Sequence, residues 1–571
     1  MWEYVGDYVA IALAGVAAVL VLGLIGLLAL APLRVHLSLR PIVFGLSAAL
    51  MVGIGALSFW SRWALLLYAV ALPVIALGLW DIFQKKHAAL RNFPVLGHFR
   101  YLLEMIRPEI RQYFIESDTE EKPFSREKRS LVYQRAKGDM DTLPFGTKEN
   151  VYEGGYEWIT HSIAAVEPPE EEPRVLVGND QCSQPYSASL FNISAMSYGS
   201  LSKTAVLALS RAAKMGGFFH NTGEGGVSPY HLEGGGDLVW QIGTGYFGCR
   251  TPDGRFCPDQ FRDQAAHPAV KMIELKLSQG AKPGHGGILP AAKVTKEIAA
   301  IRGIPMGQNI LSPPAHTAFD TPIGLLEFID QLRRLSGGKP VGFKLCVGHR
   351  SEFLSVVKAM LETEIMPDFI AVDGAEGGTG AAPHEFSSSV GMPLNMGLLL
   401  AQNGLTGAGL RGSARLIAAG RVVTGFHIVS KIALGADLCN SARGMMFAIG
   451  CIQALKCNTN HCPVGVATQN PGLYKALDPT DKAHRAANYH RATVQSVLGL
   501  LGAAGMSSPD EIAPSHICRS VTPSSVKSYA ELYDFVEEGS LLEEPYPPSL
   551  DEIWRRSSPF QFPFSRSRSA S

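Results

Sequence analysis

The sequence has few charged residues and no excess of either sign. Charged side chains make up 18% of the chain, and 51 Lys and Arg balance 51 Asp and Glu. No overall basic field exists to attract a nucleic acid, so we expect no nucleic-acid partner. The nine cysteines show no regular pairing pattern. This argues against a disulfide-stapled secreted protein and favours a reducing compartment, where thiols serve as ligands or packing residues.

Charge is missing altogether from three stretches near the N-terminus. Residues 8–33, 41–61 and 63–80 contain no charged side chain, and each run approaches the roughly 20 helical residues that span a bilayer. A cleaved signal peptide would need a basic N-terminus, whereas Glu3 and Asp7 precede the first run. We therefore predict two or three transmembrane helices within residues 1–80. So little separates the third run from the second that a buried hairpin would give the same pattern there.

The positions of Lys and Arg predict the orientation of these helices. Arg34 and Arg40 follow the first run and Arg62 follows the second, while the third is followed by Lys85, Lys86, Arg91 and Arg100. Because positive flanks stay in the cytoplasm, three spans would leave the N-terminus outside. We expect a multi-pass protein of the cell inner membrane, in contact with membrane lipid, whose catalytic domain lies in the cytoplasm.

The rest of the chain divides by composition. Residues 81–150 are rich in charge and have a helical apolar rhythm near residues 101–105, which predicts a juxtamembrane helical neck. Residues 167–173 (EPPEEEP) are too stiff and too charged for a helix or a core strand, and indicate a linker or loop. Residues 151–540 form the predicted catalytic domain. Residues 541–571 form a C-terminal tail, whose last seven residues have no apolar pattern.

Short apolar runs alternate with amphipathic segments from about residue 188 onward. This alternation predicts an α/β fold with a parallel sheet. Polar or Gly-rich loops directly follow most of the runs, as at the C-terminal face of a closed (β/α)8 barrel, whereas a doubly wound open sheet would gather them at one switch point. We favour the barrel, with an insertion over residues 232–264. The predicted strands are residues 190–195, 272–277, 341–346, 369–372, 415–418 and 437–440, and the predicted helices are residues 204–215, 323–335, 352–362 and 426–434.

Two lysines lie inside apolar strand runs. Lys276 and Lys344 each have apolar neighbours on both sides, where a solvated ammonium would be misplaced. Each therefore needs an anion, which is either a bound ligand or a carboxylate inside the barrel.

Three cysteines are closely spaced near the end of the predicted barrel. Cys451, Cys457 and Cys462 follow a Cys-x5-Cys-x4-Cys pattern, with Pro463 after the last thiol. Three thiolates in one loop suit an iron-sulfur cluster, whose binding loops often end in Cys-Pro. Zinc would need a fourth ligand, and His461 adjoins Cys462 too closely for both to bind one ion easily. The spacing alone leaves iron-sulfur, zinc and plain buried thiols open.

Five motifs in series resemble the FMN-binding synthase domain of glutamate synthase. They are residues 192–202 (NISAMSYGSLS), 221–226 (NTGEGG), 279–284 (QGAKPG), 377–381 (GGTGA) and 462–469 (CPVGVATQ). The resemblance covers roughly residues 150–520 and implies a (β/α)8 barrel that holds FMN. It also implies that Cys451, Cys457 and Cys462 hold a 3Fe-4S cluster, which needs only three ligands.

The resemblance further implies roles for individual residues. Lys276 and Lys282 would lie near the flavin and the 2-oxo acid, Lys344 would lie near the flavin ring, and Glu224 would carry the proton that accompanies imine reduction. Loops at residues 420–425 and 441–444 precede predicted helices and would offer backbone amides to the flavin phosphate. The expected cofactor-binding residues, besides Lys344, are Met196, Ser197, Asn221, Gly377, Gly378, Thr379, Gly420, Gly425, Arg443 and Gly444.

The expected substrate site departs from the family pattern. Glutamate synthases usually carry a Gln that helps to hold 2-oxoglutarate where this sequence has Ile288, and an acidic residue where it has Val227. Arg302 keeps the family's cation. Either another residue, such as His285, replaces the lost contact, or the substrate is not 2-oxoglutarate. Two apolar replacements favour a substrate that is less polar at that end.

The function that follows is reduction of an imine, formed from a 2-oxo acid and ammonia, to an amino acid. Electrons would come from ferredoxin or another redox protein, through the cluster, to FMN. A membrane segment stands where glutamate synthase has its amidotransferase domain, so we expect ammonia rather than glutamine hydrolysed by this chain. The alternative is a flavin-dependent amine or hydroxy-acid dehydrogenase that passes electrons to a membrane quinone. A third alternative is a non-catalytic membrane scaffold that retains the barrel.

Overall fold

The computed structural model describes residues 39–59 and 61–564. The chain divides into two compact units, one up to Glu121 and one from Lys122. This division falls inside the predicted neck of residues 81–150. Helix α6 (Arg126–Lys137) belongs to the second unit, where it packs against α16 and α18.

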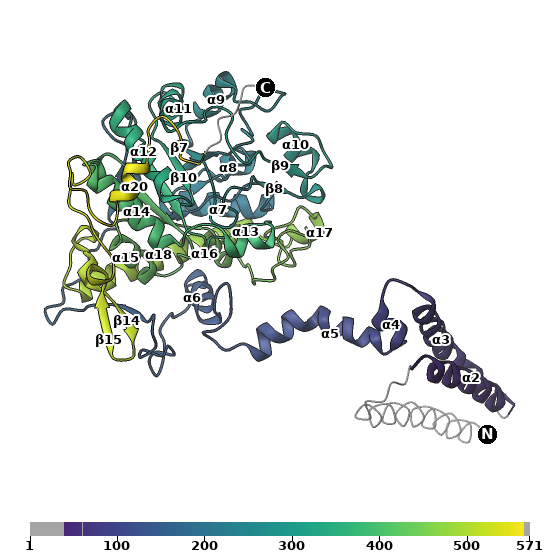
Figure 1. Cartoon of the computed structure of the whole chain (residues 1–571). Coiled ribbons are helices and arrows are strands. Elements are labelled where there is room, and N and C mark those ends of the chain that lie inside the picture. The colour runs from purple at the N-terminus through teal and green to yellow at the C-terminus, as the bar shows by residue number, and fades with distance from the viewer. Residues whose placement is uncertain (1–38, 60, 565–571) are drawn as a thin grey trace. The chain divides into compact units, whose positions relative to one another are not determined.

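The first unit is helical throughout its described part. Its elements are α2 (Leu39–Ser58), the 3-10 helix η1 (Arg62–Leu67), α3 (Tyr68–Phe83), α4 (Ala88–Asn92), α5 (Gly97–Ile110) and the π-helical turn η2 (Arg111–Ile115). Helices α2 and α3 lie side by side as a hairpin (Figure 1), which the Tyr68 hydroxyl joins by donating to the Met51 carbonyl at 2.8 Å.

Within the described residues, η1 and α3 together form one helix, Arg62–Phe83, that is long and apolar enough to cross a membrane. The part of α2 whose side chains the structure describes, Phe44–Ser58, is apolar but shorter than a span, and the predicted span over residues 8–33 lies outside the described residues. The number of membrane spans therefore stays a prediction.

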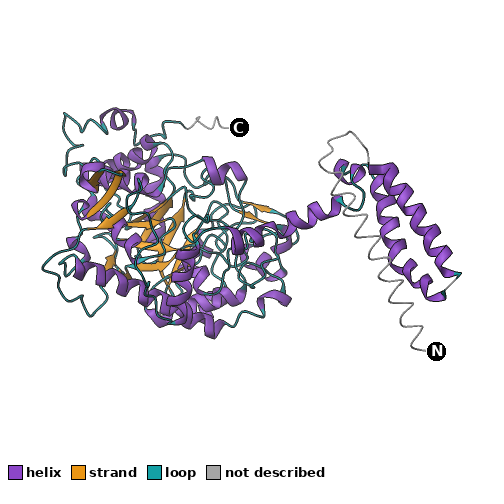
Figure 2. Ribbon diagram, turned by 90° about the horizontal axis from the view of Figure 1, so that it is seen from below, coloured by secondary structure: helices purple, strands orange, loops and turns teal. Residues whose placement is uncertain are grey.

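The second unit is built around a closed parallel barrel of eight strands, as the sequence predicts. In Figure 2 the strands gather at the centre of this unit with helices around them. The barrel strands in order are β4 (Phe191–Ile193), β5 (His220–Asn221), β6 (Leu238–Ile242), β7 (Val270–Lys276), β10 (Val341–Leu345), β11 (Phe369–Asp373), β12 (Arg415–Ala419) and β13 (Leu438–Ser441), and β13 pairs with β4 to close the ring.

Helices surround the barrel, some of them at its carboxyl end. They are α7 (Lys203–Gly216), α8 (Pro229–Gly234), α9 (Pro258–Ala265), α10 (Lys296–Arg302), α11 (Pro322–Leu335), α12 (Arg350–Thr363), α13 (His384–Ser389), α14 (Leu394–Gly407), α15 (Gly425–Ile432), α16 (Arg443–Ala448), α17 (Pro471–Tyr474) and α18 (Pro479–Ala503). The predicted start of α7 is confirmed: Ser202 caps it by accepting from the Ala205 amide at 3.2 Å, and Gly217 ends it with φ of 66°.

The insertion predicted over residues 232–264 was wrong for its central part. Residues 238–242 (LVWQI) form β6, all of whose residues are buried between β5 and β7. Gly234, Gly235 and Gly236 come directly before this strand and Gly243 follows it. The glycines give the short strand the appearance of a loop in the sequence.

Small sheets and a C-terminal segment complete the second unit. They comprise β1 (Glu157–Ile159), β2 (Arg174–Val177), β3 (Tyr186–Ser189), β8 (Ile288–Leu289), β9 (Ile310–Leu311), β14 (Ile517–Thr522), β15 (Ser525–Ser528), α19 (Tyr529–Leu532) and α20 (Asp551–Arg556). The described part of the predicted tail packs on the barrel unit, with Leu541, Leu550 and Trp554 buried.

The barrel interior is apolar at one end and polar at the other. Val177, Tyr186 and Ala188 of the β2–β3 hairpin pack with Met272 and Phe369 of the barrel strands in one buried cluster. Because alternate residues of a strand share a face, β7 continues inward from Met272 to Glu274 and Lys276, and β11 continues from Phe369 to Asp373. Polar and charged side chains therefore collect at the carboxyl ends of the strands.

Candidate active site

A cavity of about 500 Å³ opens at the carboxyl ends of the barrel strands. This is the end at which (β/α)8 barrels hold their reacting groups. The predicted site residues that line it are Met196, Ser197, Glu224, Lys276, Lys282, Ile288, Arg302, Lys344, Gly377, Gly378, Thr379, Gly420, Arg443, Gly444, Cys451 and Cys457.

A carboxylate surrounded by cations occupies one wall of the cavity. Lys276 Nζ lies 2.9 Å from Glu224 Oε1, and the two side chains are only 10% and 16% exposed. The Arg302 guanidinium is buried beside them and donates to the Tyr198 carbonyl at 3.0 Å. The Lys282 ammonium, also buried, donates to the Ala381 carbonyl at 3.1 Å. Three cations thus face one acid, which favours binding of an anion.

The charges of this cluster shift one another's pKa values. Burial alone would raise the pKa of the Glu224 carboxyl, but Lys276, followed by Lys282 and Arg302, holds that pKa below its usual value. Burial and the charge of Lys276 lower the pKa of the Lys282 ammonium to about 8, against the opposing effect of Glu224. Burial also lowers the pKa of Arg302 to about 10. Of Glu224, Lys282 and Arg302, Lys282 therefore changes charge nearest to neutral pH.

A second ion pair lies across the cavity. Lys344 Nζ is 3.3 Å from Asp373 Oδ2, and that oxygen also accepts from the Gly280 amide at 3.0 Å. Burial would lower the pKa of Lys344, but Asp373 and the nearby Glu274 raise it, so the ammonium stays charged. The anion that we expect from the sequence to accompany Lys344 is therefore the Asp373 carboxylate.

Below the cavity, Glu274 holds two amide side chains. Its Oε1 accepts from Asn221 Nδ2 at 2.8 Å and from Gln241 Nε2 at 2.6 Å. The Asn221 side chain also accepts from the Gly223 amide at 3.0 Å. Asn221 therefore sits behind the cavity wall and shapes the loop that carries Glu224, without lining the cavity itself.

Glycines allow the backbone to approach the cavity closely. A Cβ atom at Gly378 would lie 2.7 Å from Arg443 Nε, and the Arg443 Nη2 donates to the Glu376 carbonyl at 2.7 Å. Gly420 has a φ of 147°, which strains any other residue. The loops that carry Gly378, Gly420 and Gly444 thus converge around one guanidinium, an arrangement that suits a phosphate.

The side-chain oxygen of Asn440 is an unused acceptor in this wall. Asn440 lines the cavity, is 4% exposed, and its Oδ1 has no hydrogen-bond partner within residues 39–59 and 61–564. A buried amide oxygen left without a donor is costly. A ligand that offers N–H or O–H groups, as a ribitylflavin does, would satisfy it, so the residues present fit FMN.

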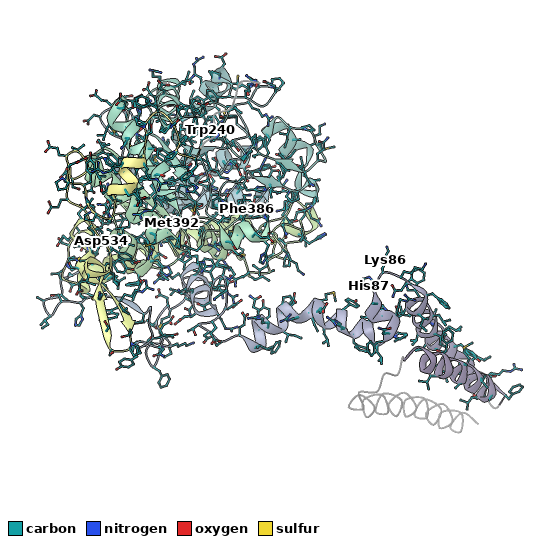
Figure 3. All side chains as sticks on the ribbon, viewed as in Figure 1. Lys86, His87, Trp240, Phe386, Met392 and Asp534 are labelled. Atoms are coloured by element: carbon teal, nitrogen blue, oxygen red, sulfur yellow. The ribbon has the colours of Figure 1, made fainter. Side chains whose placement is uncertain are left out.

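Besides Asn221, three predicted residues do not reach the cavity. His285 points its ring at Phe386, labelled in Figure 3, with ring centroids 5.1 Å apart. Gly425 packs against α18, where a Cβ would lie 2.7 Å from Ser496 Oγ. Cys462 is 6% exposed and is absent from the lining. The substitution of His285 for the missing Gln contact therefore has no support in the geometry.

The three cysteines of the predicted cluster lie near one another. Cys451 and Cys457 line the cavity, and burial raises the pKa of the Cys451 thiol to about 12, with a smaller contribution from the neighbouring thiols Cys457 and Cys462. The buried ammonium of Lys293 is close to Cys457 and Cys462 and donates to the Ser200 carbonyl at 3.0 Å. Among the described residues, no group of three or more His, Cys, Asp and Glu side chains is arranged to hold a metal ion.

Several residues of the site were not predicted from the sequence. Asp373 and Glu274 each lie on a strand face that continues from a buried apolar residue, and Glu274 stands two positions before Lys276, so strand periodicity could have found both. Gln279, inside a quoted motif, accepts from Lys276 Nζ at 3.1 Å and donates to the Gly378 carbonyl at 2.8 Å. Lys293 has no comparable signal, because its burial depends on a distant loop.

The fold and site together define a (β/α)8 barrel enzyme with an anion-binding cavity at the carboxyl ends of its strands. The family model described as a conserved region in glutamate synthase matches residues 152–507. The chain belongs to the glutamate synthase family, whose members are oxidoreductases that act on CH–NH2 donors.

Individual relatives agree with this assignment. The chain is 38% identical to the glutamate synthase large subunit-like protein YerD of Bacillus subtilis (strain 168), over 80% of this chain and 94% of that protein. It is 36% identical to an archaeal glutamate synthase (NADPH) of Methanocaldococcus jannaschii, over 56% of this chain and 60% of that protein. A solved structure of mandelate oxidase with (S)-2-phenylpropionate aligns with 70% of this chain and 98% of its own, at a TM-score of 0.36 and 14% identity, which is too weak a likeness to support an argument.

Proposed function

We propose that the chain is a membrane-attached FMN and iron-sulfur oxidoreductase of glutamate synthase type. It reduces an imine, formed from a 2-oxo acid and ammonia, to an amino acid. The observation that carries the proposal is one cavity that joins Gly-rich loops around Arg443 to a buried acid with three cations and to two cysteines.

FMN would supply the hydride that reduces the substrate, and residues of this chain would hold it. Gly378, Gly420 and Gly444 expose backbone at the cavity next to Arg443, where a phosphate would bind. Lys344, kept charged by Asp373, would stabilise negative charge on the ring. Asn440 Oδ1 would accept a hydrogen bond that it lacks within the described residues.

The cation cluster would orient the 2-oxo acid. Lys282 and Arg302 would offer positive charge to its carboxylate, and Glu224, held as a carboxylate by Lys276, would exchange a proton with the imine nitrogen. Ile288 lines the same cavity and offers no hydrogen bond. This favours a relative of 2-oxoglutarate that is less polar at its far end.

A 3Fe-4S cluster on Cys451, Cys457 and Cys462 would supply single electrons next to the flavin site. The support is the spacing of the three thiols, their closeness and the adjacent Lys293 ammonium, which would offset the negative charge of thiolates. Ferredoxin or another redox protein would be the donor.

Attachment to the inner membrane is supported by the helix Arg62–Phe83 and by the uncharged run at residues 8–33. The basic residues that follow the helix would keep the barrel in the cytoplasm. A reporter fused after residue 90 should therefore be cytoplasmic, and one fused before residue 8 should face outward if three spans are inserted.

The decisive experiment is an assay of the purified full chain with ammonia, 2-oxo acids and reduced ferredoxin. We expect bound FMN, a three-iron signal in electron paramagnetic resonance, and amino-acid formation that depends on ammonia. Reduction of the flavin by an amine or hydroxy acid, followed by reoxidation by a quinone, would replace this function with that of a dehydrogenase.

A further inference from the structure

A long amphipathic helix follows the apolar helix Arg62–Phe83 in the first unit. Helix α5 and the turn η2 continue one another over residues 97–115 (Figure 1). Seven of the large apolar side chains of this segment recur at helical spacing and form one stripe, which we call the α5 stripe: Phe99, Leu102, Leu103, Ile106, Ile110, Tyr113 and Phe114.

The α5 stripe is exposed along its length. Phe99 is 60% exposed and Phe114 is 85% exposed, and only Ile110 is partly covered. On a different face, the Tyr101 ring packs edge-on against His87, with centroids 5.7 Å apart. An isolated helix of this length is marginally stable in water unless an apolar surface covers such a stripe.

A charged row borders the α5 stripe on one side. The row has helical spacing and consists of Arg100, Glu104, Arg107 and Arg111. Arg100 Nε lies 3.1 Å from Glu104 Oε1. Between residues 84 and 115 the chain carries six Lys and Arg against two Glu, and of these cations Arg111 pairs with Glu116 just beyond the segment. This excess of positive charge complements an anionic surface. The aliphatic part of a long Arg side chain can lie on an apolar surface while its guanidinium extends to the charged headgroups.

A hydrogen bond between Asp81 and His98 fixes where this helix starts. Asp81, near the end of α3, is fully buried and lies 2.9 Å from His98 Nε2, while its Oδ2 accepts from the Val95 amide at 2.9 Å. The segment between α3 and α5, residues 84–96, is called the elbow here. It carries exposed Lys86 and His87, which are labelled in Figure 3. The elbow holds the first turn of α5 next to the end of the apolar helix Arg62–Phe83. That end is where a membrane span would leave the bilayer.

We propose that residues 97–115 form a helix that lies in the plane of an anionic lipid surface, with the α5 stripe inserted between headgroups and acyl chains. This inference rests on the proposed membrane attachment. Lipid is the occupant favoured by the elbow that joins the helix to the apolar span, by the basic excess, and by Trp80 and Tyr113, whose amphipathic rings suit the interface.

Photocrosslinking of the full chain in lipid nanodiscs tests the proposal. One variant carries p-benzoylphenylalanine in place of Phe99, on the α5 stripe. The matched control carries it in place of Met105, which is 67% exposed but lies about a third of a turn away from Phe99. Each is illuminated in phosphatidylcholine discs with and without phosphatidylglycerol, and lipid adducts are counted by mass spectrometry.

We expect at least fivefold more lipid adducts from the Phe99 variant than from the Met105 variant, and more in the discs that contain phosphatidylglycerol. Equal or absent adducts in chains that have entered the discs would overturn the in-plane helix and leave the membrane attachment standing. Adducts to another protein, in membranes from cells that express the variant, would overturn it in favour of a protein partner. Failure of the unmodified chain to enter discs would instead refute the attachment.

Discussion

The Glu224–Lys276 pair can be tested by replacing Glu224 with Gln. The substitution keeps the size of the side chain and removes its charge, which leaves Lys276 beside the Lys282 and Arg302 cations without an acid. At 2.9 Å the pair attracts by about 6 kcal/mol at an effective dielectric constant near 20. Desolvation offsets most of that attraction, but loss of one partner of a buried pair costs about 3–5 kcal/mol. Because the side chains keep 10% and 16% exposure, we expect the lower end, about 3 kcal/mol.

That cost converts to a shift in melting temperature. Residues 122–571 form the second unit, and about 450 residues at roughly 2.1 cal/mol/K each give an unfolding entropy near 0.9 kcal/mol/K. Glu224→Gln should therefore lower Tm by about 3 °C, as measured by scanning calorimetry. The FMN concentration must be the same in every sample, because a ligand of the folded state also raises Tm.

The matched control and a double substitution isolate the pair. Asp330 and Arg334 pair at 2.6 Å on the surface of α11, so Asp330→Asn should cost less than about 0.5 kcal/mol. Adding Lys276→Met to Glu224→Gln removes the unpaired ammonium and should recover part of the lost stability. The reasoning fails if Glu224→Gln melts within 1 °C of the wild type, or if the two substitutions are simply additive.

The pH dependence of this difference has a defined sign. The folded pKa of Glu224 lies below its ordinary value of 4.5. Its contribution to stability is therefore complete above about pH 4.5 and is lost as the pH falls through the folded pKa. The Tm difference between wild type and Glu224→Gln should narrow in acid.

Three further predictions concern the substrate and the cofactors. The KM for a 2-oxo acid should rise above about pH 8, as Lys282 loses its proton, and Lys282→Met should remove this step from the pH profile; a wild-type KM that is flat from pH 7 to 10 would contradict the role. Ile288→Gln should shift the ratio of kcat/KM values toward 2-oxoglutarate, against 2-oxoisocaproate, by about fivefold or more, since one hydrogen bond contributes about 1 kcal/mol; an unchanged ratio would show that Ile288 does not contact the substrate. Cys457→Ser should abolish the iron-sulfur signal but leave most of the flavin bound, because the phosphate loops are separate from the thiols; zinc in anaerobically purified wild type would refute the cluster.

The barrel was predictable because its longer strands are nearly continuous apolar runs followed by Gly-rich or polar loops. β10 and β12 match the predicted strands to within a residue, and α11 does so for the helices. The two-residue strand β5 carries too little pattern to be seen. β6 was missed because glycines surround it, and its place was fixed only by pairing with β5 and β7.

The site was predictable where the chemistry of a residue conflicts with its surroundings in the sequence. Lys276 and Lys344 stand out as charges inside apolar runs, and both line the cavity. Their partners were less visible, because Glu224 lies in the loop after β5 and Asp373 lies at the end of β11, and each meets its lysine only when the barrel closes. The predicted substrate contact of His285 has no support in the structure. His285 is close to Ile288 in the sequence, but that closeness does not determine the direction of the His285 ring, which packs on Phe386.

The pairing of β13 with β4 has a consequence for biosynthesis. The first barrel strand cannot find its last neighbour until Leu438–Ser441 has left the ribosome, and α6 waits still longer for its packing partner α18. Throughout that interval one edge of β4 is unpaired, on a nascent chain whose apolar N-terminal segment has already been made. Such open edges invite pairing with other chains. A stalled or truncated product that ends before Leu438 should therefore aggregate or be degraded rather than accumulate as a partial barrel.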